Sequence, residues 1–117
     1  MKKLFVFILQ LFVFLGVFNT SSFATGFESS GEYQRYKKSN GEYAYEEFVE
    51  DNRKIYYINE NGYKTIKSWV VIGDDYYYAA ADGEIYRDGA YLIDDNTFYF
   101  DQTGKLKKGW INMKPIQ

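Results

Sequence analysis

A tyrosine recurs every 21 residues along the chain, and a glycine follows each of these tyrosines five positions later. The tyrosines are Tyr36, Tyr57, Tyr78 and Tyr99, and the glycines are Gly41, Gly62, Gly83 and Gly104. Seven residues beyond the first three glycines stand Phe48, Trp69 and Ala90, and six beyond the last stands Trp110. A fixed period of about 20 residues indicates a solenoid, in which each unit buries its apolar face only against its neighbours. The function is therefore expected in what the stacked units present together.

Each unit is expected to be a β-hairpin that ends in a glycine turn. In the clearest unit, β-prone runs over residues 69–72 and 76–79 flank Gly73-Asp74-Asp75, a typical tight connection. The neighbouring units repeat this pattern over residues 48–58 and 90–100, and each second run leads into a periodic glycine, which can take positive φ. The sequence predicts an all-β fold, a β-hairpin solenoid over residues 35–117 with about three hairpins and partial units at both ends.

The first 24 residues have the pattern of a signal peptide. Lys2 and Lys3 precede an almost wholly apolar run over residues 4–18, and Ser22-Phe23-Ala24 places small residues at the two positions that signal peptidase reads. This run is shorter than the roughly 20 residues that span a bilayer, with an uncleaved anchor as the alternative. We expect a signal peptide helix over residues 1–24, and the Gly and Ser residues that follow indicate a spacer over residues 25–34.

Aromatic residues must supply most of the core. The chain has no cysteine, so it forms no disulfide and has no thiol for lipid attachment. All 13 tyrosines and both tryptophans follow residue 24, and each aromatic side chain can bury about 150–250 Å². Beyond Lys2 and Lys3, 12 basic residues face 16 acidic ones, a balance that argues against a nucleic-acid partner.

Two strings of this chain resemble the cell-wall-binding repeats of secreted Gram-positive proteins. They run over residues 55–62 (Ile-Tyr-Tyr-Ile-Asn-Glu-Asn-Gly) and residues 97–104 (Thr-Phe-Tyr-Phe-Asp-Gln-Thr-Gly), and Gly109-Trp110 adds a third match. The family includes choline-binding, glucan-binding and clostridial-toxin repeats, and the resemblance covers about residues 35–110. It implies a solenoid of hairpins that binds ligands between consecutive units, with no catalytic residue and no cofactor.

In the choline-binding branch of this family, aromatic side chains of two successive hairpins surround a quaternary ammonium, and each ring contact with the cation contributes roughly 0.5–2 kcal/mol. Carried over to this chain, the first-strand positions are Phe48, Trp69, Ala90 and Trp110, and the second-strand positions are Ile55, Tyr76 and Thr97. Only the Trp69 hairpin has aromatic residues at both. The resemblance therefore implies a ligand-binding site of Trp69 and Tyr76, closed by Tyr99 of the next hairpin and by Leu106.

The ligand of this site stays open between choline and a carbohydrate. The family usually has Trp where Ile55, Tyr76 and Thr97 stand, which weakens the case for choline, and aromatic grooves of this kind also stack on sugar rings. The periodic tyrosines Tyr57, Tyr78 and Tyr99 suit core packing as well as binding.

Other side chains have simpler interpretations. The aspartates at the hairpin tips are ordinary turn residues without ordered metal-ligand spacing, so no metal site is expected. No paired carboxylates are placed to flank a cleft, and the absence of histidine and cysteine removes the commonest general base and the thiol nucleophile. The basic run over residues 105–108, together with Lys114, suits either a solvated turn or a contact with a polyanion.

The sequence thus predicts a secreted, non-catalytic protein associated with the Gram-positive cell surface. Its expected partner is a cell-wall teichoic acid or polysaccharide, with no membrane span after cleavage, and a further partner is expected at the open end of the solenoid. The alternative is a secreted protein-interaction or adhesin module with a tyrosine-rich surface. A wall-degrading enzyme is a third reading, disfavoured because the repeats leave no room for a catalytic domain.

Overall fold

The computed structural model describes residues 24–107, and every regular element in this range is a β-strand. The strands are β1 (Gly26–Ser30), β2 (Tyr33–Lys37), β3 (Glu47–Asp51), β4 (Lys54–Ile58), β5 (Ser68–Ile72), β6 (Asp75–Ala79), β7 (Gly89–Ile93) and β8 (Asn96–Phe100). They pair as four antiparallel hairpins, numbered 1 to 4 in chain order. The prediction of an all-β fold of hairpins is confirmed for these residues, which include no helix that could cross a membrane.

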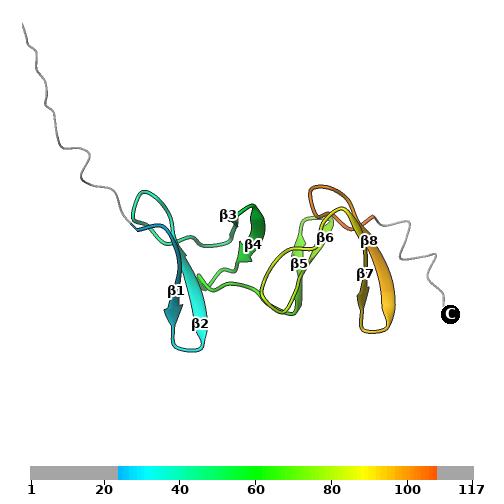
Figure 1. Cartoon of the computed structure of the whole chain (residues 1–117), viewed down its shortest axis with the longest axis horizontal. Coiled ribbons are helices and arrows are strands. Elements are labelled where there is room, and N and C mark those ends of the chain that lie inside the picture. Colours follow the sequence, from blue (N-terminus) through cyan, green and yellow to red (C-terminus); the bar gives the residue numbers. More distant parts are fainter. Residues whose placement is uncertain (1–23, 108–117) are drawn as a thin grey trace, which may run out of the picture.

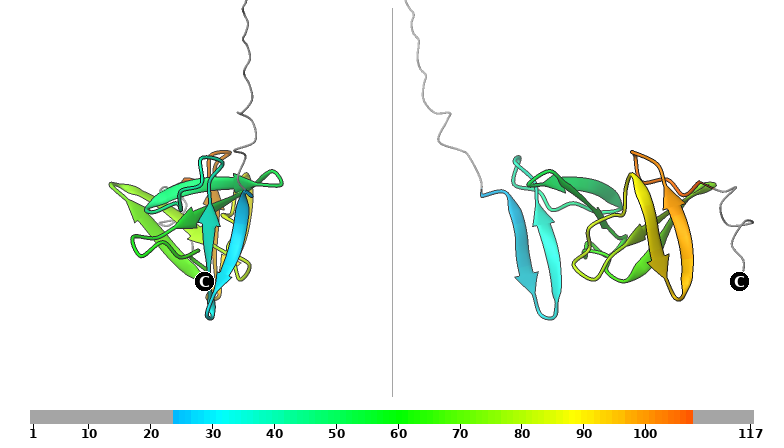
Figure 2. Two further views of the ribbon diagram at one scale, coloured as in Figure 1. Left: turned by 90° about the vertical axis from the view of Figure 1, so that its left-hand side faces the viewer. Right: turned by 45° about the vertical axis from the view of Figure 1, so that its right-hand side comes forward.

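The hairpins follow one another along the long axis of the molecule (Figure 1). The tips of hairpins 1 and 4 point the same way in this view, whereas the hairpins between them are turned in other directions (Figure 2). Because successive hairpins turn about the axis, each one packs its two faces against different neighbours. The signal peptide expected over residues 1–24 and the Gly109-Trp110 pair lie outside the described residues, apart from Ala24.

The spacer expected over residues 25–34 is wrong, because this segment belongs to a complete hairpin. β1 pairs with β2 in a five-residue register from Gly26↔Lys37 to Ser30↔Tyr33. Phe27 stands 21 residues before Phe48 and shares its place in the repeat, although polar neighbours hide the alternation of a strand. The array therefore has four complete hairpins in the described range instead of about three, and it begins near residue 26 instead of residue 35.

The tips of the hairpins are two-residue turns of the kinds that match strand twist. In hairpins 2 and 4 both tip residues have positive φ: 53° and 69° at Asn52 and Arg53, and 50° and 71° at Asp94 and Asp95. The other two tips begin with a glycine, Gly31 or Gly73. Arg53 and Asp95 thus hold a left-handed conformation that glycine adopts at lower cost.

The segment that follows each hairpin is called a connector, and the connectors after hairpins 2, 3 and 4 tie their hairpin to the one before. Every connector passes through a periodic glycine with φ between 87° and 97°, and then forms a single bridge with the strand it has just left. Three connector residues also donate a backbone hydrogen bond of 2.8 Å to a second strand two strands earlier: Lys64 to Gln34, Ile85 to Ile55, and Leu106 to Tyr76. Each of these three connectors therefore fixes the position of one hairpin against the previous one.

The core is divided into three clusters that follow the repeat. Ile58, Ala79 and Phe100 occupy the same place at the end of successive second strands, and all three are fully buried. Around them lie Tyr36, Ala44 and Val49 in the first cluster, Val70, Tyr77 and Ile85 in the second, and Ile93 and Leu106 in the third. Partly buried aromatic rings pack against each cluster, so aromatic side chains complete the core, as predicted from the sequence.

Hairpin 1 carries a polar network where the later hairpins carry rings. Arg35 stands at the place of Tyr56, Tyr77 and Phe98 in the repeat. Its guanidinium lies 3.6 Å from the ring centroid of Tyr43 and donates to the hydroxyl of Tyr45 at 2.8 Å. The Tyr43 hydroxyl in turn donates to Glu28 at 2.8 Å, and Lys37 pairs with Glu28 at 3.6 Å. A charged face of this kind is typical of the terminal unit of a repeat array.

Candidate functional site

Consecutive hairpins meet at three equivalent places, which we call joints. Each joint combines a first-strand ring, the residue seven positions later in the same hairpin, a ring of the next hairpin, and a connector residue. Joint 1 contains Phe27, Gln34, Tyr56 and Lys64; joint 2 contains Phe48, Ile55, Tyr77 and Ile85; joint 3 contains Trp69, Tyr76, Phe98 and Leu106. In every joint the connector residue bonds to the backbone of the second-strand residue, so the four members are held together by the fold.

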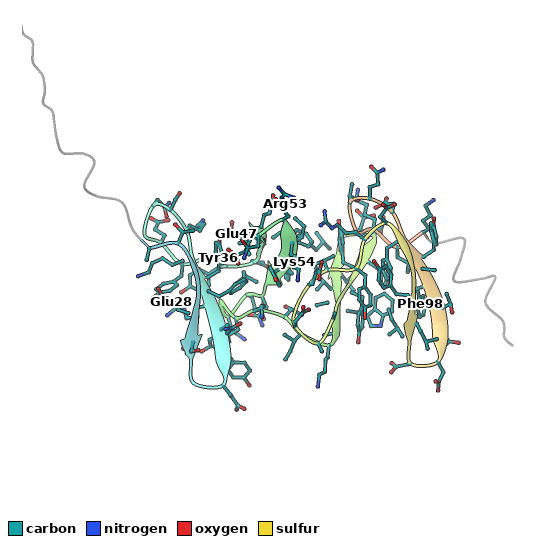
Figure 3. All side chains as sticks on the ribbon, in the orientation of Figure 1. Glu28, Tyr36, Glu47, Arg53, Lys54 and Phe98 are labelled. Carbon is teal, nitrogen blue, oxygen red and sulfur yellow. The ribbon has the colours of Figure 1, made fainter. Side chains whose placement is uncertain are left out.

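Joint 3 has the largest set of aromatic side chains. The Trp69 ring lies edge-on to Tyr78 and to Phe98 of the next hairpin, with both centroid distances 5.1 Å, and Tyr76 stands at 6.4 Å with an interplanar angle of 80°. Tyr76 is 40% exposed, while Leu106 is the buried member of the joint. Figure 3 shows side chains filling the space between hairpins 3 and 4, where Phe98 is labelled. The half-buried Trp69 and the exposed Tyr76 thus present an aromatic corner to solvent.

The structure brings together three of the four site residues predicted from the sequence. Trp69, Tyr76 and Leu106 share joint 3, but the ring that the next hairpin contributes is Phe98 and not Tyr99. Side chains alternate between the faces of a strand, so Tyr99 lies on the face of β8 opposite to Phe98. There it pairs across the hairpin with Ala90, and the Lys107 ammonium lies 4.8 Å from its ring centroid. In the structure Phe98, one residue before Tyr99, is therefore the ring of β8 that lies against Trp69.

Joint 2 is filled by its own side chains. Phe48 lies edge-on to Tyr57 at 5.0 Å and to Tyr77 at 4.9 Å, the same arrangement as at Trp69. Tyr77 and Ile85 are buried, and burial raises the pKa of the Tyr77 hydroxyl. With Ile55 in the place of Tyr76, this joint offers no exposed aromatic ring, and its role is packing.

Joint 1 contains a cation that belongs to the chain. Phe27 lies edge-on to Tyr36 at 5.0 Å and to Tyr56 at 4.9 Å, as in the other joints. The Lys64 ammonium lies 4.9 Å from the ring centroid of Phe27 and 5.3 Å from that of Tyr56. Desolvation by burial holds the pKa of Lys64 below its usual value, with Asp82 acting in the opposite direction.

A stack of three tyrosines that the sequence did not predict lies beside joint 3. Tyr86 stacks on Tyr91 at 3.9 Å and on Tyr78 at 5.6 Å, and the Tyr91 hydroxyl donates to the carbonyl oxygen of Arg87 at 2.7 Å. An open cavity of about 540 Å³ adjoins the stack, and Glu84, Arg87, Asp88 and Gln102 contribute polar groups to its lining. The sequence does contain an indication of this stack. One position of the repeat is Ala44 in the first unit, Thr65 in the second and the aromatic Tyr86 in the third.

The charged groups noted in the sequence are mostly engaged within the protein. Lys105 of the basic run pairs with Asp75 at 3.6 Å, and Lys107 lies over Tyr99, so these two lysines do not form a common patch for a polyanion. Lys108 and Lys114 lie outside the described residues. In the range 24–107 no group of three or more carboxylates is placed to hold a metal ion.

The repeat geometry coincides with a known family of repeats. The model of the cell wall binding repeat matches residues 46–64 and residues 91–106. The first match runs from just before β3 through Lys64, and the second runs from within β7 to Leu106. Each therefore contains all or most of one hairpin, its glycine turn and the first part of its connector. These two segments are similar to cell wall binding repeats. The family resemblance drawn from residues 55–62 and 97–104 is thereby confirmed.

Solved structures share the fold of this array of hairpins. The pneumococcal cell wall endolysin from phage Cp-1, complexed with choline, is 20% identical with a TM-score of 0.63, over 71% of this chain and 24% of the endolysin. The choline binding domain of Spr1274 from Streptococcus pneumoniae is 24% identical with a TM-score of 0.60, over 71% of this chain and 94% of that domain. A truncated alternansucrase from Leuconostoc mesenteroides is 27% identical with a TM-score of 0.65, over 70% of this chain and 8% of the enzyme.

The extent of these matches limits what they say about this chain. The array corresponds to about a quarter of the endolysin and to a small part of the alternansucrase, so the likeness concerns the repeats and not the whole proteins. No curated protein sequence matches the chain.

Proposed function

We propose that this chain is a secreted, non-catalytic protein that attaches to a Gram-positive cell-wall polymer, and that joint 3 binds a quaternary ammonium group of that polymer. The observation that carries the proposal is the aromatic corner of Trp69, Tyr76 and Phe98 beside Leu106, which joint 3 alone presents among the three joints of residues 24–107. The negative faces of aromatic rings attract a cation most strongly where water is displaced from it. The cell-wall-binding repeats around the joint and the choline-binding domain among the similar structures support this choice of ligand.

The experiment uses the intrinsic fluorescence of Trp69. The chain has two tryptophans, so the Trp110→Phe variant reports on Trp69 alone. We expect choline to change the fluorescence of this variant saturably, and we expect purified choline-containing cell walls to retain the protein until free choline is added. If choline leaves the fluorescence unchanged and the walls release the protein only when free glycans are added, the ligand is a carbohydrate and not a cation. Failure to bind any wall preparation would favour the protein-interaction module.

The carbohydrate alternative has its own supporting observation. Sugar rings stack on aromatic faces, and their hydroxyl groups require nearby donors and acceptors. The tyrosine stack of Tyr78, Tyr86 and Tyr91 lies beside a cavity whose lining includes Glu84, Arg87 and Gln102. Tyr91→Ala would weaken glycan binding at this cavity and leave the choline response of Trp69 unchanged, which separates the two ligands.

A further inference from the structure

The connector residue of joint 1 differs in kind from those of the other joints. Ile85 and Leu106 are 1% and 6% exposed and complete apolar clusters, whereas Lys64 brings a charge to the same place. All three residues make the same 2.8 Å backbone hydrogen bond to the previous hairpin. The lysine therefore starts from a fixed backbone position at the edge of the joint.

The side chain of Lys64 is directed into the joint by its surroundings. Its stem lies against Gly83, where an added Cβ would stand 2.8 Å from Cδ and 3.0 Å from Cε of the lysine. The ammonium then lies within 5.3 Å of the ring centroids of both Phe27 and Tyr56, inside the range of cation–π attraction. Among residues 24–107 no carboxylate forms an ion pair with it. The rings are thus the groups that the cation contacts most closely.

We propose that Lys64 is a built-in occupant of joint 1, whose ammonium takes the place beside two aromatic rings that a ligand cation would otherwise take. This inference rests on the proposed function of joint 3, because the two joints are built from the same repeat positions. It assigns different tasks to them: joint 1 is satisfied internally and holds hairpins 1 and 2 together, while joint 3 receives the external quaternary ammonium.

Replacing the lysine should open joint 1 to such a ligand. Lys64→Met keeps an unbranched stem over Gly83 and removes the charge, which makes joint 1 similar to joint 3 in its connector residue. An open cavity of about 210 Å³ borders Gln34 and Lys64, so this edge of joint 1 faces solvent. Because joint 1 has Gln34 where joint 3 has Tyr76, its opened form offers one ring fewer, and we expect binding about 3- to 10-fold weaker than at joint 3.

The test is an NMR titration with tetramethylammonium that follows the ring resonances of both joints. In the wild type we expect shifts at Trp69 and Tyr76 and none at Phe27 and Tyr56. In Lys64→Met we expect additional shifts at Phe27 and Tyr56. Lys54→Met is the matched control, since Lys54 lies exposed at a hairpin tip with only a 3.9 Å pairing to Glu84, and it should behave as the wild type.

The outcomes distinguish this inference from the proposed function. If tetramethylammonium shifts the Phe27 resonances in Lys64→Met but leaves those of Trp69 unchanged, the result supports the role of Lys64 and refutes the role of joint 3. Two results would overturn the role of Lys64. In the first, the Trp69 resonances shift while those of Phe27 and Tyr56 stay unchanged in the folded Lys64→Met variant. In the second, Phe27 and Tyr56 shift equally in the wild type, where Lys64 is present. Silence at both joints would contradict both.

A second measurement needs neither ligand nor the Lys64 variant. Protons of the Lys64 ε-methylene near two ring faces should resonate upfield of their random-coil position in the wild type, and Phe27→Leu should reduce this displacement by about half. An ε-methylene resonance at its random-coil position in the wild type would refute the proposal even if Lys64→Met failed to fold.

Discussion

Trp69 and Phe48 form a matched pair that separates binding from packing. Each ring makes two close edge-on contacts, at 5.1 and 5.1 Å for Trp69 and at 5.0 and 4.9 Å for Phe48. Such contacts contribute about 0.5–1.5 kcal/mol each beyond area burial, so Trp69→Leu and Phe48→Leu should each lower the free energy of unfolding by about 1–3 kcal/mol. The two variants are expected to lose similar stability and to remain apolar at the substituted position.

Only the Trp69 variant should lose affinity for the wall. Joint 3 presents Tyr76 to solvent beside Trp69, whereas joint 2 is filled by Ile55 and the buried Ile85. Loss of one ring from a cation site costs about 1–2 kcal/mol, which corresponds to roughly 5- to 30-fold in affinity. Chemical denaturation followed by circular dichroism measures the first effect, and retention on purified cell walls measures the second. A folded Trp69→Leu variant that binds walls as well as Phe48→Leu would refute the placement of the site in joint 3.

Three further predictions concern the fold and its processing. Burial acts to raise the pKa of Asp101, but hydrogen bonds from Thr103 and from the backbone of Lys105 outweigh it and hold that pKa below its usual value. A depressed folded-state pKa stabilises the fold above the unfolded-state pKa, and this contribution is lost as the pH falls through the folded-state value. Asp101→Asn should therefore flatten the acid limb of a stability-against-pH profile while keeping the turn, as Asn59 does at the equivalent place; an unchanged acid limb would contradict this. Arg53→Gly should raise the unfolding free energy by up to about 1 kcal/mol by relieving a φ of 69°, measured by denaturant titration, and a destabilised variant would argue against the strained turn. Mass spectrometry of culture supernatant should find a mature chain that starts at Thr25, a cleavage that leaves β1 intact, and a full-length species alone would refute processing.

The sequence predicted what repeats along the chain, because a period imposes the same backbone on every unit. The four periodic glycines have nearly the same positive φ, and the three expected hairpins form with tips within one residue of the expected ones. Hairpin 1 was not predicted because only Phe27 and Tyr36 keep the apolar pattern in its strands. The other positions include the polar residues Glu28, Ser29, Gln34 and Arg35. The composition of residues 25–34 resembles that of a linker, and β1 is a strand because it pairs with β2.

Features that depend on how hairpins turn against each other were less accessible. The choice between Phe98 and Tyr99 depends on which face of β8 meets hairpin 3, and a single strand's alternation does not reveal this. Lys64 was visible as a polar residue in a connector, but the direction of its side chain follows from Gly83 of the next connector. The tyrosine stack combines residues of one hairpin, its connector and the next hairpin, and it too arises only when these are assembled.

The overlap of the joints constrains how the number of sites can change in evolution. Each joint draws on positions offset by 0, 7, 29 and 37 residues, a stretch longer than the 21-residue period, so every internal hairpin serves two joints at once. Recombination that gains or loses a multiple of 21 codons keeps all four offsets and adds or removes one joint as a whole. An insertion of any other length shifts the connector residue away from its hydrogen-bond partner in the previous hairpin and damages two neighbouring joints together. Lineages with such arrays should therefore differ in whole repeats.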